Sequence, residues 1–140
     1  HINDGLNVTG LNSKHNKSMQ QIIIDGEVLL ELKQIFEIQK EFDRKLRWNA
    51  YEKCRTPEDA LNFIEHFVLV MVEELGEISR IRKQYYRDKQ TFTVEELKHE
   101  LIDIFVYFMQ ACMALNMDLE KDYVEKMKYN ENHFIYKDTQ

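Results

Sequence analysis

Turn-forming residues are scarce in this sequence: one proline and four glycines stand among 140 residues. Architectures built from many short strands need such residues at their turns, so the scarcity argues against a β fold and favours long helices. The two cysteines, Cys54 and Cys112, form no CxxC motif and have no paired spacing. We therefore expect an all-α protein with free thiols in a reducing compartment.

Long apolar runs and an excess of basic charge are also missing. No segment reaches the roughly eighteen uninterrupted apolar residues of a membrane span, and no signal peptide is recognisable before the domain. The formal net charge is −6, whereas proteins that bind the nucleic-acid backbone usually carry a basic face. We predict a cytoplasmic protein with no membrane and no nucleic acid as partner.

The N-terminal residues differ from the rest of the chain. Residues 1–18 are rich in asparagine and show no apolar period, and Met19 opens a more ordinary sequence. We interpret 1–18 as a leader or tag-like segment without a function of its own. Residues 19–140 are long enough for one domain with a substantial core and too short for two, so we predict a single domain there.

Apolar spacing and capping signals predict four helices. The first is expected from Glu27 to about Trp48, where apolar residues recur at three- and four-residue intervals. Thr56-Pro57 begins the second, of about thirty residues, and a capping box at Thr93 begins the third, which runs to about Asn116. Asp118 caps the fourth, over 119–134, with Leu119, Tyr123, Met127 and Phe134 on its inner face. Short connections predict a bundle of long antiparallel helices.

Two pairs of acids stand at matching positions in the second and third helices: Glu74 with Glu77, and Glu100 with Asp103. Residues three apart on a helix lie on one face, so each pair directs two carboxylates the same way. Apolar residues flank both pairs, which predicts that neither lies on an ordinary solvated face. At an effective dielectric of about 20, two carboxylates about 4 Å apart repel by roughly 4 kcal/mol. Hard oxygen ligands of this kind suit Mg²⁺, with Mn²⁺ as the alternative.

These acids resemble a known signature. Glu73-Glu74-Leu-Gly-Glu77 followed by Glu100-Leu-Ile-Asp103 is similar to the EExxE and ExxD motifs of the all-α nucleoside triphosphate pyrophosphohydrolases, which include MazG-like proteins, dCTP pyrophosphatases and dimeric dUTPases. Tyr107 stands four residues after Asp103, and Lys126 with Asn130 resembles the C-terminal KxxxN element of that superfamily. The resemblance covers about residues 30 to 134.

The resemblance implies a chemistry. Glu74, Glu77, Glu100 and Asp103 would hold Mg²⁺ ions around a nucleoside triphosphate, and water would attack the α-phosphorus to release the monophosphate and pyrophosphate. Glu73, beside the cluster, or Glu74 itself would act on the proton of that water. The remaining contacts to substrate would come from Tyr107, Lys126 and Asn130.

Two features leave the subfamily open. His133 stands where many MazG-like members have arginine, and Gln39 to Asp43 is similar to the QxxLD start of dimeric dUTPases. Trp48 has two interpretations: stacking on a nucleobase, or a place in the core or a subunit interface.

Each acidic motif also has a simpler interpretation, because EExxE is common on exposed helices. The alternative function is a non-catalytic helical module that senses nucleotide or metal, or that serves oligomerisation. A surplus of apolar residues beyond the inner helix faces predicts a homodimer or homotetramer, as in the relatives that the sequence resembles. This surplus comprises Phe63, Phe67, Val70, Ile102, Val106 and Met109.

Overall fold

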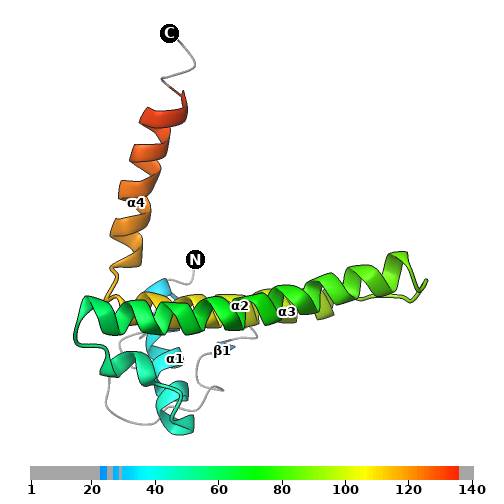
Figure 1. Cartoon of the computed structure of the whole chain (residues 1–140), viewed down its shortest axis with the longest axis horizontal. Helices are drawn as coiled ribbons and strands as arrows, with labels where there is room; N and C mark the ends of the chain where they lie inside the picture. Colours follow the sequence, from blue (N-terminus) through cyan, green and yellow to red (C-terminus); the bar gives the residue numbers. More distant parts are fainter. Residues whose placement is uncertain (1–22, 25–26, 29, 136–140) are drawn as a thin grey trace. The chain divides into compact units, whose positions relative to one another are not determined.

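The computed structural model describes residues 23–24, 27–28 and 30–135 (Figure 1). Its contacts group into two compact units, residues 1–46 and 47–140, which are considered separately below. The segment interpreted as a leader, 1–18, lies outside the described residues, and the single domain over 19–140 stays a prediction.

The first unit contains a short β pair and one helix. Strands β1 (Ile23–Ile24) and β2 (Glu27–Val28) pair antiparallel, with Ile23 opposite Val28, and α1 spans Leu32–Leu46. The prediction of a helix from Glu27 was therefore wrong by five residues. Asp25-Gly26, between isoleucines and valine, is a strong sequence signal for a two-residue hairpin connection, and it overrides the helical spacing that begins at Val28.

The second unit is built on a long helical hairpin. Helix α2 (Pro57–Tyr86) and helix α3 (Val94–Ala114) lie side by side and antiparallel (Figure 1). Thr56 and Thr93 form capping boxes with Asp59 and Glu96: each threonine hydroxyl accepts from a backbone N–H, and each carboxylate accepts in return. These ends confirm the predicted helix starts, because the capping groups satisfy donors that the first turn leaves free.

The buried part of this unit lies at one end of the hairpin. A short 3-10 helix, η3 (Ala50–Lys53), packs against α3 and α2 there, and the ring of Tyr51 meets that of Phe63 edge-on at 6.1 Å. Small side chains let the elements approach closely at this end. Ile81 is buried nearer the other end of α2. The other buried apolar residues in the described part of this unit are Tyr51, Ala60, Met109, Ala111, Cys112 and Ala114. Met109, predicted as part of an apolar surplus, is thus core.

The fourth helix does not pack along the hairpin. Helix α4 (Leu119–Asn130) begins after the Asp118 cap, as predicted, and continues as a π-helical turn, η4 (Glu131–Ile135). The axes of α3 and of Leu119–Phe134 meet at a 95° bend, and no residue of α4 is buried. Of its predicted inner face, Tyr123, Met127 and Phe134 are exposed, so that prediction was wrong for the single chain.

The predicted all-α class is confirmed, since helices make up most of the described residues.

Within the described part of the chain, no single helix has the length and apolar character needed to cross a membrane. Taken together, α3 and α4 pass that test of length and composition as a bent pair.

The cap of α2 makes stability depend on pH. The Asp59 carboxylate accepts from the backbone N–H groups of Arg55 at 2.9 Å and Thr56 at 3.2 Å, and these bonds hold its pKa below the ordinary value of 3.8. A depressed pKa contributes stability that is complete above the unfolded value and is lost as pH falls through the folded one. We expect Asp59→Ala to lower the urea midpoint at pH 7. The difference from wild type should shrink below pH 3.8, and a difference independent of pH would contradict this account of the cap.

Candidate metal site and adjoining pocket

The antiparallel packing of α2 and α3 brings acids from both helices together. One carboxylate oxygen from each of Glu74, Glu100 and Asp103 lies within 4.8 Å of the others. Glu74 and Glu100 are half-buried, and Asp103 is exposed. The three-residue spacing thus places Glu74 of the first predicted pair opposite both acids of the second pair. The oxygen-only donor set suits Mg²⁺ or Mn²⁺.

The ionised form of the Glu74 carboxyl is destabilised by burial and by the neighbouring acids. Its pKa is raised above the ordinary value, first by burial and then by the negative charges of Asp103 and Glu100. A hydrogen bond with Glu100 and the charge of Glu77 act in the same direction. A cation at this point would remove the repulsion and satisfy the carboxylates together.

The other two predicted acids lie at the edge of this cluster. Glu77 is outside the group of three, and its carboxylate forms an ion pair with Arg80, at 2.9 Å from Nη2. Arg80 Nε also donates to the same carboxylate at 2.9 Å. Glu73 is exposed, one helical step of about 100° away from Glu74. The three-residue separation of Glu77 and Arg80 on α2 places the two side chains on one face, where such a pair can form.

The apolar surroundings of the acids are more open than predicted. Leu75 is 54% exposed and Ile102 is 60% exposed, so the side of each helix turned away from its partner meets solvent in the single chain. Sequence spacing identified apolar residues around the acids correctly. It did not reveal that one neighbouring helix covers only one face of each.

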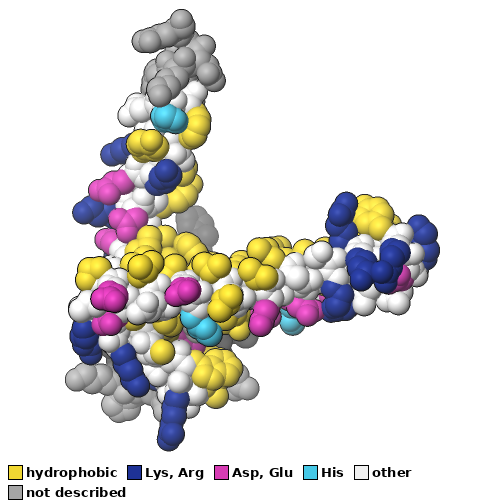
Figure 2. Space-filling model, in the orientation of Figure 1, with side chains coloured by type: hydrophobic (Ala, Val, Ile, Leu, Met, Phe, Trp, Pro, Cys, Tyr) yellow, Lys and Arg dark blue, Asp and Glu magenta, His cyan; other side chains and the backbone are white. Residues whose placement is uncertain are grey.

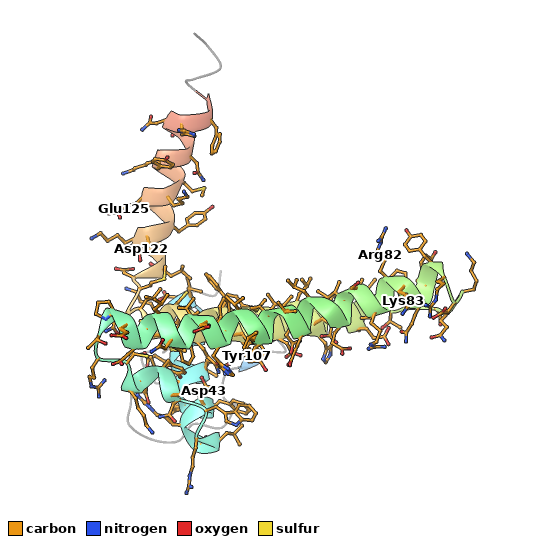
Figure 3. The ribbon with its side chains drawn as sticks, viewed as in Figure 1. Asp43, Arg82, Lys83, Tyr107, Asp122 and Glu125 are labelled. Carbon is orange, nitrogen blue, oxygen red and sulfur yellow. The ribbon has the colours of Figure 1, made fainter. Side chains whose placement is uncertain are left out.

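Tyr107 links the acid cluster to a pocket, and Figure 3 labels it midway along the paired helices. Its ring is half-buried, and its pKa is raised by burial and by the charges of Glu74, Asp103 and Glu73. The pocket has a volume of about 280 Å³. Its lining comes from η3, the residues just before it, α2 and α3, and comprises Trp48, Ala50, Phe63, His66, Phe67, Val70, Tyr107 and Gln110.

Two polar residues of this pocket, Gln110 and His66, are not among the site residues predicted from the sequence. Gln110 is 9% exposed and stands three residues after Tyr107 on the same face of α3, which is the signal that could have identified it. His66 on α2 also lines the pocket. Trp48, for which base stacking and a place in the core or a subunit interface were both open, lines the pocket and is 59% exposed.

A second cavity lies on the other side of the acids along the hairpin. It has a volume of about 340 Å³ and is lined by Arg80, Ile81, Thr93, Glu95, Glu96, His99 and Glu100. Glu100 therefore belongs both to the acid cluster and to this cavity. Arg80 gives the cavity a positive group close to the acids.

Helix α4 does not bring its predicted substrate residues to the acids. Lys126 lies with its ammonium 4.6 Å from the centroid of the Tyr129 ring, and Asn130 is half-buried near the end of the helix. His133 stacks on Tyr129 at 5.5 Å. The 95° bend after α3 separates this group from the hairpin within one chain.

Comparisons of this chain with protein-family models, with curated proteins and with solved structures found no match.

Proposed function

We propose that this protein is a Mg²⁺-dependent nucleoside triphosphate pyrophosphohydrolase, which converts a ribo- or deoxyribonucleoside triphosphate to the monophosphate and pyrophosphate. The observation that carries the proposal is the meeting of Glu74, Glu100 and Asp103 within 4.8 Å, directly beside a pocket lined by aromatic rings. The motif resemblance supports the same chemistry. The cellular role would be the sanitation of nucleotide pools in the cytoplasm, or the removal of dUTP or dCTP.

The order of groups along the hairpin fits a nucleotide laid parallel to it. The aromatic pocket with Tyr107 and Trp48 offers flat apolar surfaces for a base, with Gln110 and His66 as polar groups at its walls. The acids follow along the helices, and the cavity that contains Arg80 comes next. Base, metal-bound phosphate and phosphate tail would occupy these three places in sequence.

The acid set suits a catalytic metal. Mg²⁺ or Mn²⁺, when bound, would neutralise triphosphate charge and lower the pKa of the attacking water. Attack of that water on the α-phosphorus forms one P–O bond and breaks the bond to the bridging oxygen, so that pyrophosphate leaves. Glu74, Glu100 and Asp103 would hold the ion, joined by Glu77 if it leaves Arg80, while Glu73 or Glu74 accepts the proton of the water.

We also propose that the working form is a homodimer or homotetramer in which α4 and the hairpins complete a four-helix bundle. Apolar residues on the outer faces of α2, α3 and α4 support this: Val68, Leu69, Val72, Leu101, Ile102, Val124 and Tyr129 are all at least 49% exposed. A patch of this kind marks an interface. Assembly would provide the route by which Lys126 and Asn130 reach a nucleotide.

The proposal is tested by a panel of ribo- and deoxyribonucleoside triphosphates with Mg²⁺ or Mn²⁺. We expect pyrophosphate, and not orthophosphate, from at least one of them. An absence of turnover on every triphosphate with both metals would refute the enzyme and favour the alternative, a non-catalytic module that senses nucleotide or metal or that serves oligomerisation. The ion pair between Glu77 and Arg80 supports the alternative, because it keeps one of the four predicted metal ligands out of the cluster.

A further inference from the structure

The C-terminal end of α2 and the loop that leads to α3 carry a charge opposite to that of the chain as a whole. Residues 79–92, here called the basic tip, contain Arg80, Arg82, Lys83, Arg87 and Lys89 with Asp88 as the one acid, a charge of +4. Because the full chain has −6, the remaining residues carry −10. Figure 2 shows these dark blue side chains gathered at one end of the hairpin. Such a local reversal of sign concentrates anions.

Three of the cations share one helix face around a depression of about 190 Å³. Its lining consists of Ser79, Arg82, Lys83, Tyr86 and Arg87. These positions follow the spacing i, i+3, i+4, i+7 and i+8, which defines one side of a helix. Cations in the last turn also complement the helix dipole, but that effect does not require them to share a face. The helix dipole therefore does not explain why Arg82, Lys83 and Arg87 share this face with the hydroxyl-bearing residues Ser79 and Tyr86.

The other two cations of the tip, Arg80 and Lys89, do not line the depression. Arg80 binds Glu77 and Gln84, and Lys89 Nζ donates to the backbone carbonyl of Tyr86 at 2.9 Å. Arg87 is paired with Asp88, at 3.0 Å between Nη2 and Oδ2. The cations that line the depression, Arg82, Lys83 and Arg87, carry two net positive charges together with Asp88.

The tip is held in place by aromatic contacts. Tyr85 meets Tyr86 and Phe92 edge-on, each with ring centroids 5.0 Å apart. The Arg82 guanidinium lies 5.3 Å from the centroid of the Tyr86 ring. A guanidinium placed in this way loses less conformational entropy on binding a ligand than a free side chain would.

We propose that this face of the basic tip binds a phosphate monoester dianion. The two net charges match the charge of −1.5 to −2 that a phosphate monoester carries near pH 7. Guanidinium groups and the hydroxyls of Ser79 and Tyr86 are donors that phosphate oxygens accept. The site is separate from the acid cluster, since Glu74 and Lys83 are nine residues apart on α2, about 14 Å along the axis. It does not depend on the proposed catalytic function.

The test is an NMR titration of the full ¹⁵N-labelled chain in EDTA at constant ionic strength, so that no metal links an anion to the acids. Inorganic phosphate and a nucleoside 5′-monophosphate are added separately, which distinguishes free phosphate from an organic ester. We expect saturable shifts of the amide signals of residues 79–88. The Arg82→Gln/Lys83→Gln variant should bind at least tenfold more weakly, and Lys98→Gln, which removes an exposed cation of α3, should bind like wild type.

Several results would overturn the proposal: shifts that do not saturate, unchanged affinity in the double variant, or equal affinity for chloride. Binding of an oligonucleotide without terminal phosphate, combined with no binding of monoesters, would also overturn it and identify a nucleic-acid surface instead. The replaced side chains are exposed, and circular dichroism checks that each variant is folded. If the double variant is not folded, Arg87→Gln takes its place with the same expected loss.

Discussion

Glu74→Gln is expected to lower kcat for pyrophosphate release about a thousandfold. Glu74 lies at the centre of the acid cluster, and its pKa is raised by burial and by Asp103 and Glu100. Glutamine keeps the size of the side chain but removes one negative charge and one strong ligand oxygen. Metal stabilisation of the transition state is worth several kcal/mol, and about 4 kcal/mol corresponds to a thousandfold in rate.

The matched control for this variant is Glu65→Gln. Glu65 is an exposed glutamate on the same helix, outside the acid cluster, so its replacement should leave kcat within about twofold of wild type. Asp103→Asn should behave like Glu74→Gln, because both contribute to the cluster. If Glu74→Gln keeps full activity while the protein remains folded, the cluster is not the catalytic centre, whatever reaction the protein performs.

Mg²⁺ is expected to raise the melting temperature by about 10 °C at a concentration one hundred times its dissociation constant. Binding to the folded state alone contributes about 2.7 kcal/mol under that condition, and a domain of this size shifts by about 4 °C per kcal/mol. EDTA should reverse the shift. Differential scanning fluorimetry over a Mg²⁺ series, in wild type and Glu74→Gln, measures both effects.

The melting temperature of the metal-free protein gives a second test of the acid cluster. A carboxyl with a raised folded pKa destabilises the fold increasingly as pH rises above the unfolded pKa, and the effect is complete above the folded pKa, since the unfolded chain ionises more easily. Glu74→Gln removes this repulsion, so in EDTA at pH 7 it should melt above wild type, and the difference should shrink as pH falls through the pKa of Glu74. A melting temperature of wild type that does not respond to Mg²⁺ would show that the acids do not form a shared site.

The local structure of the hairpin could be predicted from sequence because its determinants are local. Thr56 with Asp59 and Thr93 with Glu96 satisfy the first backbone donors of their own helices, which requires no knowledge of distant contacts. The same holds for the Asp118 cap. The start of α1 was misjudged because a hairpin signal, Asp25-Gly26, competed with helical spacing over the same residues.

The meeting of acids from two helices was predictable for a related reason. An antiparallel pair with a short connection places residues at equal distances from the turn side by side. Counted from Tyr86 and Val94, Glu77 and Asp103 meet that condition, and Glu74 lies within one helical turn of it. The ion pair of Glu77 with Arg80 competes with the cluster for one carboxylate. Spacing alone cannot decide between the two partners of Glu77.

The partner of each apolar face could not be read from the sequence. Periodicity identifies that Tyr123 and Met127 lie on one side of α4, yet both are exposed in the single chain. Which surface covers them depends on contacts between elements or between chains, and those contacts leave no periodic signal. The spacing places Gln110 on the same face of α3 as Tyr107, but it does not show that η3 packs on α3.

We expect one site both to hold the metal and to direct water to the α-phosphorus. The most direct test is ³¹P NMR of the products formed in ¹⁸O-labelled water, with Mg²⁺ and the best triphosphate of the panel. We expect the label in the nucleoside monophosphate and unlabelled pyrophosphate, because attack at the α-phosphorus leaves the new oxygen on that phosphorus. Label in pyrophosphate or orthophosphate, or no turnover, would contradict the account.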